Sequence, residues 1–465
     1  MKINSICCIG AGYVGGPSMA VIAYKCPNIQ INVVDINCER IEQWNQKDLA
    51  KLPIYETGLD KIVEKCRGVN LHFSTEIEKN ISKADMIFIS VNTPTKTEGY
   101  GAGLAIDLKW VEASARKISE FATGETIVVE KSTLPVRTAQ TIKEILESSN
   151  KNSSNKKIFH VLSNPEFLAE GTAINDLLYP ARILVGGSHQ DSIKSLSRIY
   201  SNWIEKEKII TTNLWSAELS KLIANAFLAQ RVSSINSVSA ICESTGAKIQ
   251  DVALAIGKDN RIGEYFLNAG PGFGGSCFKK DILNLVYICN YYGLHEVSQY
   301  WQQIININNW QKKRISKLIV EKLFGTISGK KIAIFGFAFK ANTNDTRESP
   351  AISISQELLS EGAYLTFYDP KVNEQQIEKE LNMDNPKLDS KIRSSNWSFH
   401  KDKYESTLDA DALVILTEAD EFKVLNWDKI SRNMRSPAWI FDTKGLCNTA
   451  KIQKFGLNLW TIGVG

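Results

Sequence analysis

The chain has 465 residues, of which 43% are hydrophobic, and its 55 Lys and Arg against 51 Asp and Glu leave a net charge of +4. This length predicts two to four domains at about 100–200 residues each. The near-balanced charge without a Lys/Arg-rich block argues against a nucleic-acid-binding protein. The absence of any run of about 18 apolar residues argues against a membrane-spanning helix.

The nine cysteines are odd in number and form no Cys-x-x-Cys pair. We therefore expect free thiols and a cytoplasmic location instead of a disulfide framework. The five histidines are scattered, so no metal site is predicted. The short polar start, followed directly by an apolar run, does not resemble a signal peptide.

Strands and helices are predicted to alternate through the first part of the chain. Apolar runs at 3–9, 31–35, 86–91, 126–130 and 158–162 predict strands, with helical stretches between them. This alternation is typical of a doubly wound parallel sheet. The polar stretch 148–157 is predicted to be a surface loop.

Helices are predicted to dominate the middle of the chain. One long run covers 215–246 and a second covers about 280–324, with apolar residues at helical spacing. Strands are again predicted at 330–335, 363–368, 411–416 and 438–442. The expected fold is α/β, with two Rossmann-like doubly wound domains at 1–212 and 326–465 joined by a helical region at 213–325.

A glycine-rich turn at 10–15 lies between the first predicted strand and the first predicted helix. Its Gly-x-Gly-x-x-Gly spacing lets the backbone approach a pyrophosphate at the helix N-terminus. Asp35, at the end of the next strand, suits the adenosine ribose hydroxyls and favours NAD over NADP. The alternative is a tight turn without a ligand. Arg40 flanks the pyrophosphate or lies on a solvated helix face.

Cys277 follows four glycines in 270–281 and precedes a helical pattern. A helix N-terminus and the neighbouring Lys279 and Lys280 both favour a thiolate. Asp281, four residues on, shares the helix face of Cys277, and such a pair suits covalent catalysis. The alternative is a buried structural cysteine.

Three further segments offer catalytic groups. Glu166 and Glu170 are spaced i, i+4, so one can act as a general base, or both belong to a solvated helical turn. Lys221 and Asn225 share one helix face and can donate hydrogen bonds to an oxyanion, or they are solvated. Thr133 follows a strand end, where it binds a ligand or caps a helix.

Long motifs along nearly the whole chain resemble the UDP-glucose 6-dehydrogenase family, within the UDP-glucose/GDP-mannose dehydrogenase group. The resemblance is greatest to the animal-type enzymes. The motifs are IGAGYVGGP (9–17), LPIYETGL (52–59), VNTPTKT (91–97), EKSTLPVR (130–137), SNPEFLAEGTA (163–173), ELSKLIANAFLAQR (218–231), GFGGSCFKKD (272–281) and GFAFKANTNDTRES (336–349).

The resemblance implies a four-electron oxidation of UDP-glucose to UDP-glucuronate with two NAD and one water. In the family, a cysteine matching Cys277 forms a thiohemiacetal and then a thioester. Lys221 and Asn225 match the oxyanion-stabilising pair, and Glu166 matches the acid–base residue of thioester hydrolysis. Asp281 and Thr133 match the residues that order the water. The product is a precursor for polysaccharides.

The resemblance also implies the binding residues. Those for NAD are Gly10, Ala11, Gly12, Tyr13, Val14, Gly15, Asp35, Arg40, Ser90, Val91, Asn92, Thr93, Pro94, Lys131, Ser132, Thr133, Glu170, Cys277, Lys280 and Arg347. Those for the UDP-sugar are Glu166, Phe167, Leu168, Ala169, Glu170, Lys221, Asn225, Arg261, Asn268, Phe273, Gly274, Lys340 and Lys444.

The family pattern further implies a homo-oligomer, a dimer or a hexamer, in which the long helix forms the dimer spine and Arg261 reaches a neighbouring subunit. Lys444 stands where family members usually have an arginine, so the bidentate fork is lost. Two alternatives remain at this point. One is a dehydrogenase of another UDP- or GDP-sugar, and the other is a non-catalytic regulator that binds NAD and a UDP-sugar.

Overall fold

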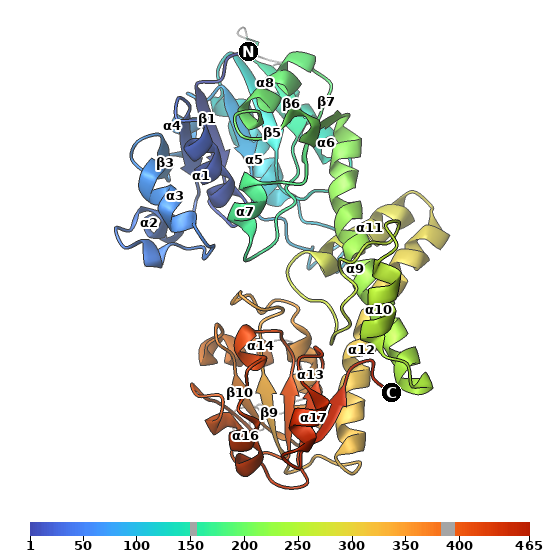
Figure 1. Ribbon diagram of the computed structural model, residues 1–465. Helices are drawn as coiled ribbons and strands as arrows, with labels where there is room; N and C mark the ends of the chain where they lie inside the picture. The colour runs from blue at the N-terminus through green and yellow to red at the C-terminus, as the bar shows by residue number, and fades with distance from the viewer. Residues whose placement is uncertain (149–155, 383–395) are drawn as a thin grey trace. The chain divides into compact units, whose positions relative to one another are not determined.

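The chain forms two compact units in a computed structural model that describes residues 1–148, 156–382 and 396–465 (Figure 1). The first unit contains Met1–Ala224 and Leu283–Ile288, and the second contains Asn225–Ile282 and Cys289–Gly465. The division at 212 and 325 stays a prediction. Most of the predicted loop at 148–157 lies outside the described residues.

The first unit is built on an eight-stranded sheet in the order β3-β2-β1-β4-β5-β6-β7-β8, in which only the β6–β7 pair is antiparallel among the described strands. The strands are β1 (Ser5–Ile9), β2 (Gln30–Val34), β3 (Leu71–Ser74), β4 (Met86–Ile89), β5 (Glu125–Glu130), β6 (Ile158–Ser163), β7 (Ile183–Gly187) and β8 (Ile209–Thr212).

Helices cover both faces of this sheet. They are α1 (Gly15–Lys25), α2 (Cys38–Asn45), α3 (Leu59–Cys66), α4 (Ile77–Ile81), α5 (Lys109–Phe121), α6 (Thr138–Ser148), α7 (Ala173–Leu178) and α8 (Gln190–Tyr200). Successive residues of β1 face opposite ways, so that Cys8 joins the core under α1, α3, α7 and α8 while Cys7 joins the core under α4, α5 and α6. The predicted doubly wound arrangement is confirmed.

The second unit carries a six-stranded parallel sheet in the order β11-β10-β9-β12-β13-β14. This order repeats that of β3-β2-β1-β4-β5-β6, so the second Rossmann-like fold is also confirmed. Its elements are β9 (Lys331–Phe335), α13 (Pro350–Ser360), β10 (Tyr364–Tyr368), α14 (Glu374–Asn382), β11 (Trp397–Phe399), β12 (Ala412–Ile415), α16 (Trp427–Asn433), β13 (Trp439–Asp442), α17 (Thr449–Gln453) and β14 (Asn458–Thr461).

The first strand of each sheet, β1 or β9, is followed by the same kind of glycine turn. The acidic residue after the neighbouring strand, Asp35 or Asp369, makes different hydrogen bonds in the two sheets. Gly10 (φ +109°) donates to Val34 O at 2.7 Å, and Gly336 (φ +89°) donates to Tyr368 O at 2.9 Å. Asp369, after β10, accepts four backbone N–H groups, from residues 337, 338, 371 and 372. A carboxylate has about four lone-pair sites, so this one is saturated. The second turn therefore offers no free acidic acceptor for a ribose.

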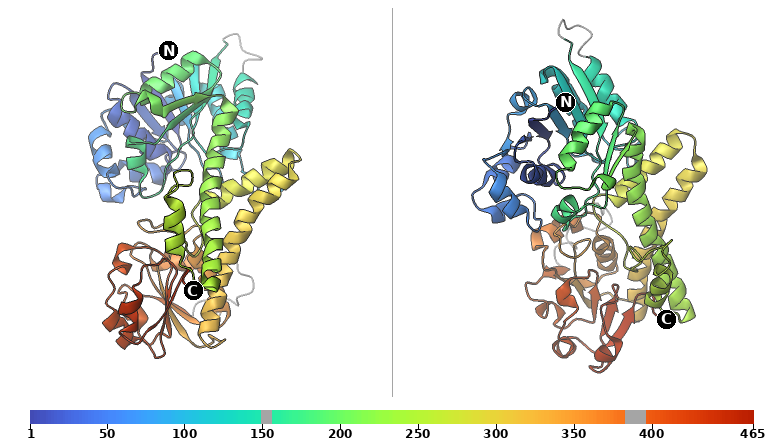
Figure 2. Two further views of the ribbon diagram at one scale, coloured as in Figure 1. Left: turned by 45° about the vertical axis from the view of Figure 1, so that its right-hand side comes forward. Right: turned by 45° about the horizontal axis from the view of Figure 1, so that its top comes forward.

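Four helices form the middle of the chain: α9 (Leu214–Thr245), α10 (Ile249–Gly257), α11 (Phe278–Tyr291) and α12 (His295–Lys322). The prediction of one run at 280–324 is wrong, because Gly293 takes a φ of +72° and ends α11. Figure 2 shows α12 alongside the C-terminal part of α9, where Arg314 and Glu243 form an ion pair at 2.6 Å. Among the described residues, no helix combines the length and apolar character needed to cross a membrane.

Candidate active site

The three glycines of the turn at 10–15 are explained by different features of the structure. A Cβ on Gly10 would lie 2.1 Å from Ser90 O, and a Cβ on Gly15 would lie 2.0 Å from Gly10 O. A Cβ on Gly12, by contrast, would meet no protein atom within 4 Å. Gly10 and Gly15 are thus required by the fold, whereas the open side of Gly12 leaves room for a ligand at the start of α1.

Two alanine substitutions separate these roles. We expect Gly12→Ala to keep the melting temperature and to raise the KM for a dinucleotide about tenfold or more, because the new methyl fills ligand space. Gly10→Ala should instead destabilise the fold, because its Cβ overlaps backbone atoms and its φ is positive. Thermal unfolding measures the melting temperature of each variant, and initial rates at varied NAD concentration measure its KM for NAD. A large loss of stability in Gly12→Ala would contradict this division of roles.

Asp35 lies at the end of β2 and faces the turn. Its Oδ2 accepts from Ala11 N–H at 2.8 Å, and its Oδ1 accepts from Asn37 N–H at 2.9 Å. Arg40 lies 3.5 Å from Oδ2. Unlike Asp369, this carboxylate keeps acceptor capacity for ribose hydroxyls. Trp44, which we did not single out from the sequence, is buried and donates from Nε1 to Ala11 O at 2.9 Å.

The ends of β4 and β5 are joined by side-chain hydrogen bonds. Ser132 donates to Val91 O at 2.8 Å, and Thr93 donates to Thr133 O at 3.2 Å. Residues 90–94 and 131–133 therefore lie together at the carboxyl edge of the sheet, where doubly wound folds bind ligands. The Lys131 ammonium is buried and lies 3.1 Å from Asn164 Oδ1, so its side chain serves the interior of the unit.

Glu166 and Lys221 form a buried ion pair in the first unit. Lys221 Nζ lies 3.2 Å from Glu166 Oε1, and only 4% and 8% of the two side chains are exposed. Leu168 N–H donates to Glu166 Oε2 at 2.6 Å. Burial raises the pKa of Glu166, but Lys221 and the Leu168 N–H outweigh burial and hold the pKa below its ordinary value. Glu166 is therefore ionised at neutral pH.

The ion pair predicts a pH dependence of stability. Because the pKa of Glu166 is lower in the folded state, its contribution is complete above the ordinary value of about 4.3 and is lost as the pH falls through the depressed pKa. We expect the free energy of unfolding in urea to fall less between pH 7 and below pH 4 in Glu166→Gln than in the wild type. The exposed Glu78→Gln is the control. Equal acid losses in the wild type and Glu166→Gln would contradict the assignment.

The alternative in which Glu166 and Glu170 belong to a solvated helical turn is wrong. Residues 164–169 have no regular secondary structure, and the next helix begins only at Ala173. Pro165 explains the difference, because its fixed φ and the restriction on the preceding residue disfavour a helix start there. Glu166 is buried against Lys221, while Glu170 is partly exposed. This segment thus offers one buried base and one accessible carboxylate.

Cys277 is exposed and stands one residue before α11, as predicted. Asp281 N–H donates to Cys277 O at 2.9 Å, and its buried carboxylate accepts from Asn225 Nδ2 at 2.6 Å. Asn225 lies four residues after Lys221 in α9. Burial raises the pKa of Cys8 to about 12 and that of Cys26 to about 11, so those thiols are inert.

Buried amides fix the glycine-rich segment before Cys277. Asn308 accepts from Phe273 N–H at 2.8 Å and donates to Phe273 O at 3.1 Å. Gln311 donates to Gly270 O, and Asn236 accepts from Gly270 N–H, both at 2.8 Å. Sequence reasoning missed these three amides, because polar residues on a helix normally face solvent.

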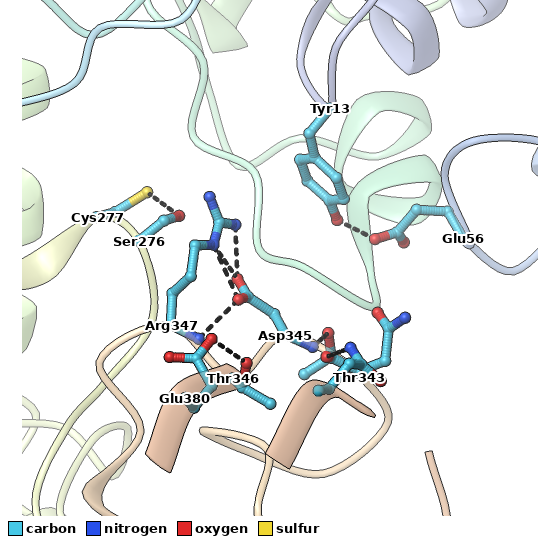
Figure 3. Close-up of polar contacts among 11 residues, drawn as sticks. Tyr13, Glu56, Ser276, Cys277, Thr343, Asp345, Thr346, Arg347 and Glu380 are labelled. Carbon is cyan, nitrogen blue, oxygen red and sulfur yellow. Dashed lines mark hydrogen bonds and ion pairs between the residues drawn. The ribbon is translucent and has the colours of Figure 1, made fainter. Parts of the chain in front are cut away.

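The loop 336–349 borders the same segment. Gly275 N–H donates to Arg347 O at 2.8 Å, and a Cβ on Gly274 would lie 2.5 Å from Glu348 O. Arg347 is held in a fork by Asp345, with Nη2 and Oδ2 2.6 Å apart (Figure 3). Lys279 pairs with Glu348 at 2.8 Å, so a carboxylate offsets the charge that we expected beside Cys277.

The remaining predicted substrate residues lie in varied surroundings in the second unit. Lys444 pairs with Glu418 at 2.6 Å, and a Cβ on Gly270 would lie 3.6 Å from its ammonium. Asn268 is exposed and Lys340 partly exposed. The Arg261 side chain is 89% exposed and pairs with Asp259 at 2.6 Å, so it points to solvent.

Comparisons with known proteins cover almost the whole chain. Models of the UDP-glucose/GDP-mannose dehydrogenase family match with the NAD binding domain at 4–204, the central domain at 215–310 and the UDP binding domain at 333–449. UDP-glucose 6-dehydrogenase 1 of Glycine max is 54% identical over 470 residues, covering 98% of this chain and 96% of that protein. UDP-glucose 6-dehydrogenase of Drosophila melanogaster is 55% identical over 463 residues with the same coverages.

A solved structure supports the same assignment. The UDP-glucose dehydrogenase of the archaeon Pyrobaculum islandicum superposes with a TM-score of 0.83 at 25% identity, covering 100% of this chain and 98% of that one. A plant and an animal relative thus match to nearly the same degree, and an archaeal structure shares the fold.

Proposed function

The chain belongs to the UDP-glucose/GDP-mannose dehydrogenase family, as its motifs predicted, and we propose that it oxidises UDP-glucose to UDP-glucuronate through a covalent intermediate on Cys277. One observation carries the proposal. The exposed thiol of Cys277 lies at the start of α11, one turn before a buried Asp281 that is hydrogen-bonded to Asn225. A thiol that only binds or packs has no need of this arrangement.

The chain is an NAD-dependent oxidoreductase, and the turn at 10–15 fits the cofactor. The open side of Gly12 and the acceptor capacity of Asp35 are what a pyrophosphate and a ribose require. When bound, NAD accepts the hydride in each of the two oxidations. Its further proposed contacts are Arg40, residues 90–94, residues 131–133, Glu170, Cys277, Lys280 and Arg347.

Cys277 holds the sugar between the two oxidations. Its sulfur adds to the carbonyl carbon of the C6 aldehyde, and the resulting oxyanion is stabilised by the Lys221 ammonium and the Asn225 amide. Oxidation of this thiohemiacetal gives a thioester. Water then attacks the thioester carbonyl, the C–S bond breaks, and the thiolate leaves as UDP-glucuronate forms.

The hydrolytic step needs a base that is ionised at neutral pH. Glu166 meets this condition, because Lys221 lowers its pKa. Asp281 and Thr133 orient the water in this proposal. Residues 268–274, Lys340 and Lys444 bind the UDP-sugar, with Lys444 oriented by Glu418.

We also propose a cytoplasmic homo-oligomer that assembles through the helical region. Large apolar side chains are exposed there, among them Phe227 (53%), Ile241 (60%), Leu254 (60%) and Tyr265 (85%). Exposed apolar surface of this extent is typical of a protein interface. Sedimentation equilibrium should give at least twice the mass of one chain, and a monomer at micromolar concentration would contradict the proposal.

The decisive experiment for the function measures stoichiometry. Purified protein with limiting UDP-glucose and excess NAD should form two NADH and one UDP-glucuronate per sugar. The absence of NADH formation would exclude the proposed oxidation of UDP-glucose. A parallel panel with UDP-N-acetylmannosamine and GDP-mannose should give far lower kcat/KM values, and a preference for either would replace the proposed substrate.

A further inference from the structure

Glu56 is a buried carboxylate, 5% exposed, in the segment before α3. Its Oε1 accepts hydrogen bonds from the Tyr13 hydroxyl and from Gly171 N–H, the latter at 2.6 Å. Its Oε2 accepts from Ala173 N–H at 2.9 Å. Figure 3 shows Tyr13 and Glu56 pointing toward each other. One carboxylate therefore joins two segments that are about 160 residues apart in the chain.

These two segments have different proposed ligands. Tyr13 belongs to the turn 10–15, whose open glycine suits the pyrophosphate. Gly171 directly follows residues 166–170, which include the base Glu166. All five are assigned to the UDP-sugar, and Glu170 is assigned to NAD as well. Because all these residues lie in the first unit, the link through Glu56 is internal to that unit.

The hydrogen bonds to Glu56 are of the strong, charge-assisted kind. Burial and the neighbouring Glu56 raise the pKa of Tyr13 far above its ordinary value, so the phenol remains a donor at any working pH. Removing the Tyr13 hydroxyl takes one of three hydrogen bonds from the buried Glu56 carboxylate. The link is thus built to hold its two segments in one relative position.

We propose that Glu56 is a positioning residue that couples NAD binding to UDP-sugar binding. The inference rests on the proposed assignment of the two segments to these ligands. A dinucleotide that orders the turn restrains Tyr13, and through Glu56 it also orders the backbone after Glu170. By thermodynamic reciprocity, a UDP-sugar that orders 166–170 strengthens dinucleotide binding by the same factor.

The test uses NADH and UDP-glucose, a pair that cannot react. The fluorescence of NADH gives its Kd for the full-length protein with and without saturating UDP-glucose. In the wild type we expect UDP-glucose to tighten NADH binding about fivefold or more. In Tyr13→Phe and in Glu56→Gln we expect this ratio to fall close to one.

Tyr13→Phe decides the question if Glu56→Gln does not fold, because it removes one hydroxyl and leaves Gly171 and Ala173 bonded to Glu56. Tyr24→Phe is the matched control, because Tyr24 lies near the end of α1 and is exposed (37%), and it should keep the wild-type ratio. A wild-type ratio of one, or an unchanged ratio in folded Tyr13→Phe, would overturn the coupling. Normal turnover in that wild-type preparation would leave the proposed function standing, whereas absence of turnover would overturn the function itself.

Discussion

Replacing Cys277 by serine is expected to lower UDP-glucuronate formation about a thousandfold or more. A serine hydroxyl is not ionised at neutral pH, and an ester of it does not reproduce the reactivity of a thioester. The side chain is exposed at the start of α11, so the fold should be unchanged. Steady-state NADH formation measures the loss, and calorimetric titration should show NAD and UDP-glucose still binding.

Cys38 provides the matched control for this experiment. It is also exposed and is the first residue of a helix, α2. The buried Asp281 hydrogen-bonded to Asn225, by contrast, lies one turn after Cys277. Cys38→Ser should retain near-normal turnover. If Cys277→Ser produced UDP-glucuronate at the wild-type rate, the covalent mechanism would be excluded.

Replacing Lys221 by methionine is expected to have the second largest effect. Loss of the ammonium removes an oxyanion donor, which typically costs about a hundredfold to a thousandfold in kcat. It also leaves Glu166 buried without its cation, at a cost of about 3–5 kcal/mol in the free energy of unfolding. Urea unfolding and kcat measured on the same preparation separate the two effects.

The surface pair of Lys117 and Glu78 is the control for stability. Its nitrogen–oxygen distance is also 3.2 Å, but the two side chains are 43% and 56% exposed. Lys117→Met should change the free energy of unfolding by less than about 1 kcal/mol. The double variant Lys221→Met/Glu166→Gln should recover part of the stability lost in Lys221→Met. If the double variant recovered no stability, the ion pair with Glu166 would not explain the stability that is lost in Lys221→Met.

Much of the fold was predictable because its central strands are continuous apolar runs. Residues 86–89 and 126–130 are buried in a parallel sheet, and such strands are recognisable by composition alone. The short strands β3, β7 and β8, which lie toward the sheet edges, were missed. β3 and β8 mix polar with apolar residues, and β7 ends in two glycines. Periodicity alone also failed to predict the break near Gly293, which divides the predicted helical run at 280–324 into α11 and α12.

The local part of the site was predictable for a similar reason. The glycine turn before α1 and the position of Cys277 before α11 depend on residues that are adjacent in sequence. The parts that were missed depend on contacts between distant segments. Glu56 acquires its role only when folding brings Tyr13 and Gly171 to it. Asn308 and Gln311 look like surface residues of a helix, yet both are buried and bind the glycine-rich segment.

The covalent role of Cys277 is tested most directly by trapping the intermediate. Glu166→Gln should slow hydrolysis, so rapid acid quenching with UDP-glucose and NAD should preserve a UDP-glucuronyl thioester. Peptide mass spectrometry should place this adduct on the peptide that contains Cys277 and on no other cysteine peptide. An adduct on another cysteine, or two NADH per sugar with no adduct at any time and full activity in Cys277→Ser, would contradict the proposed mechanism.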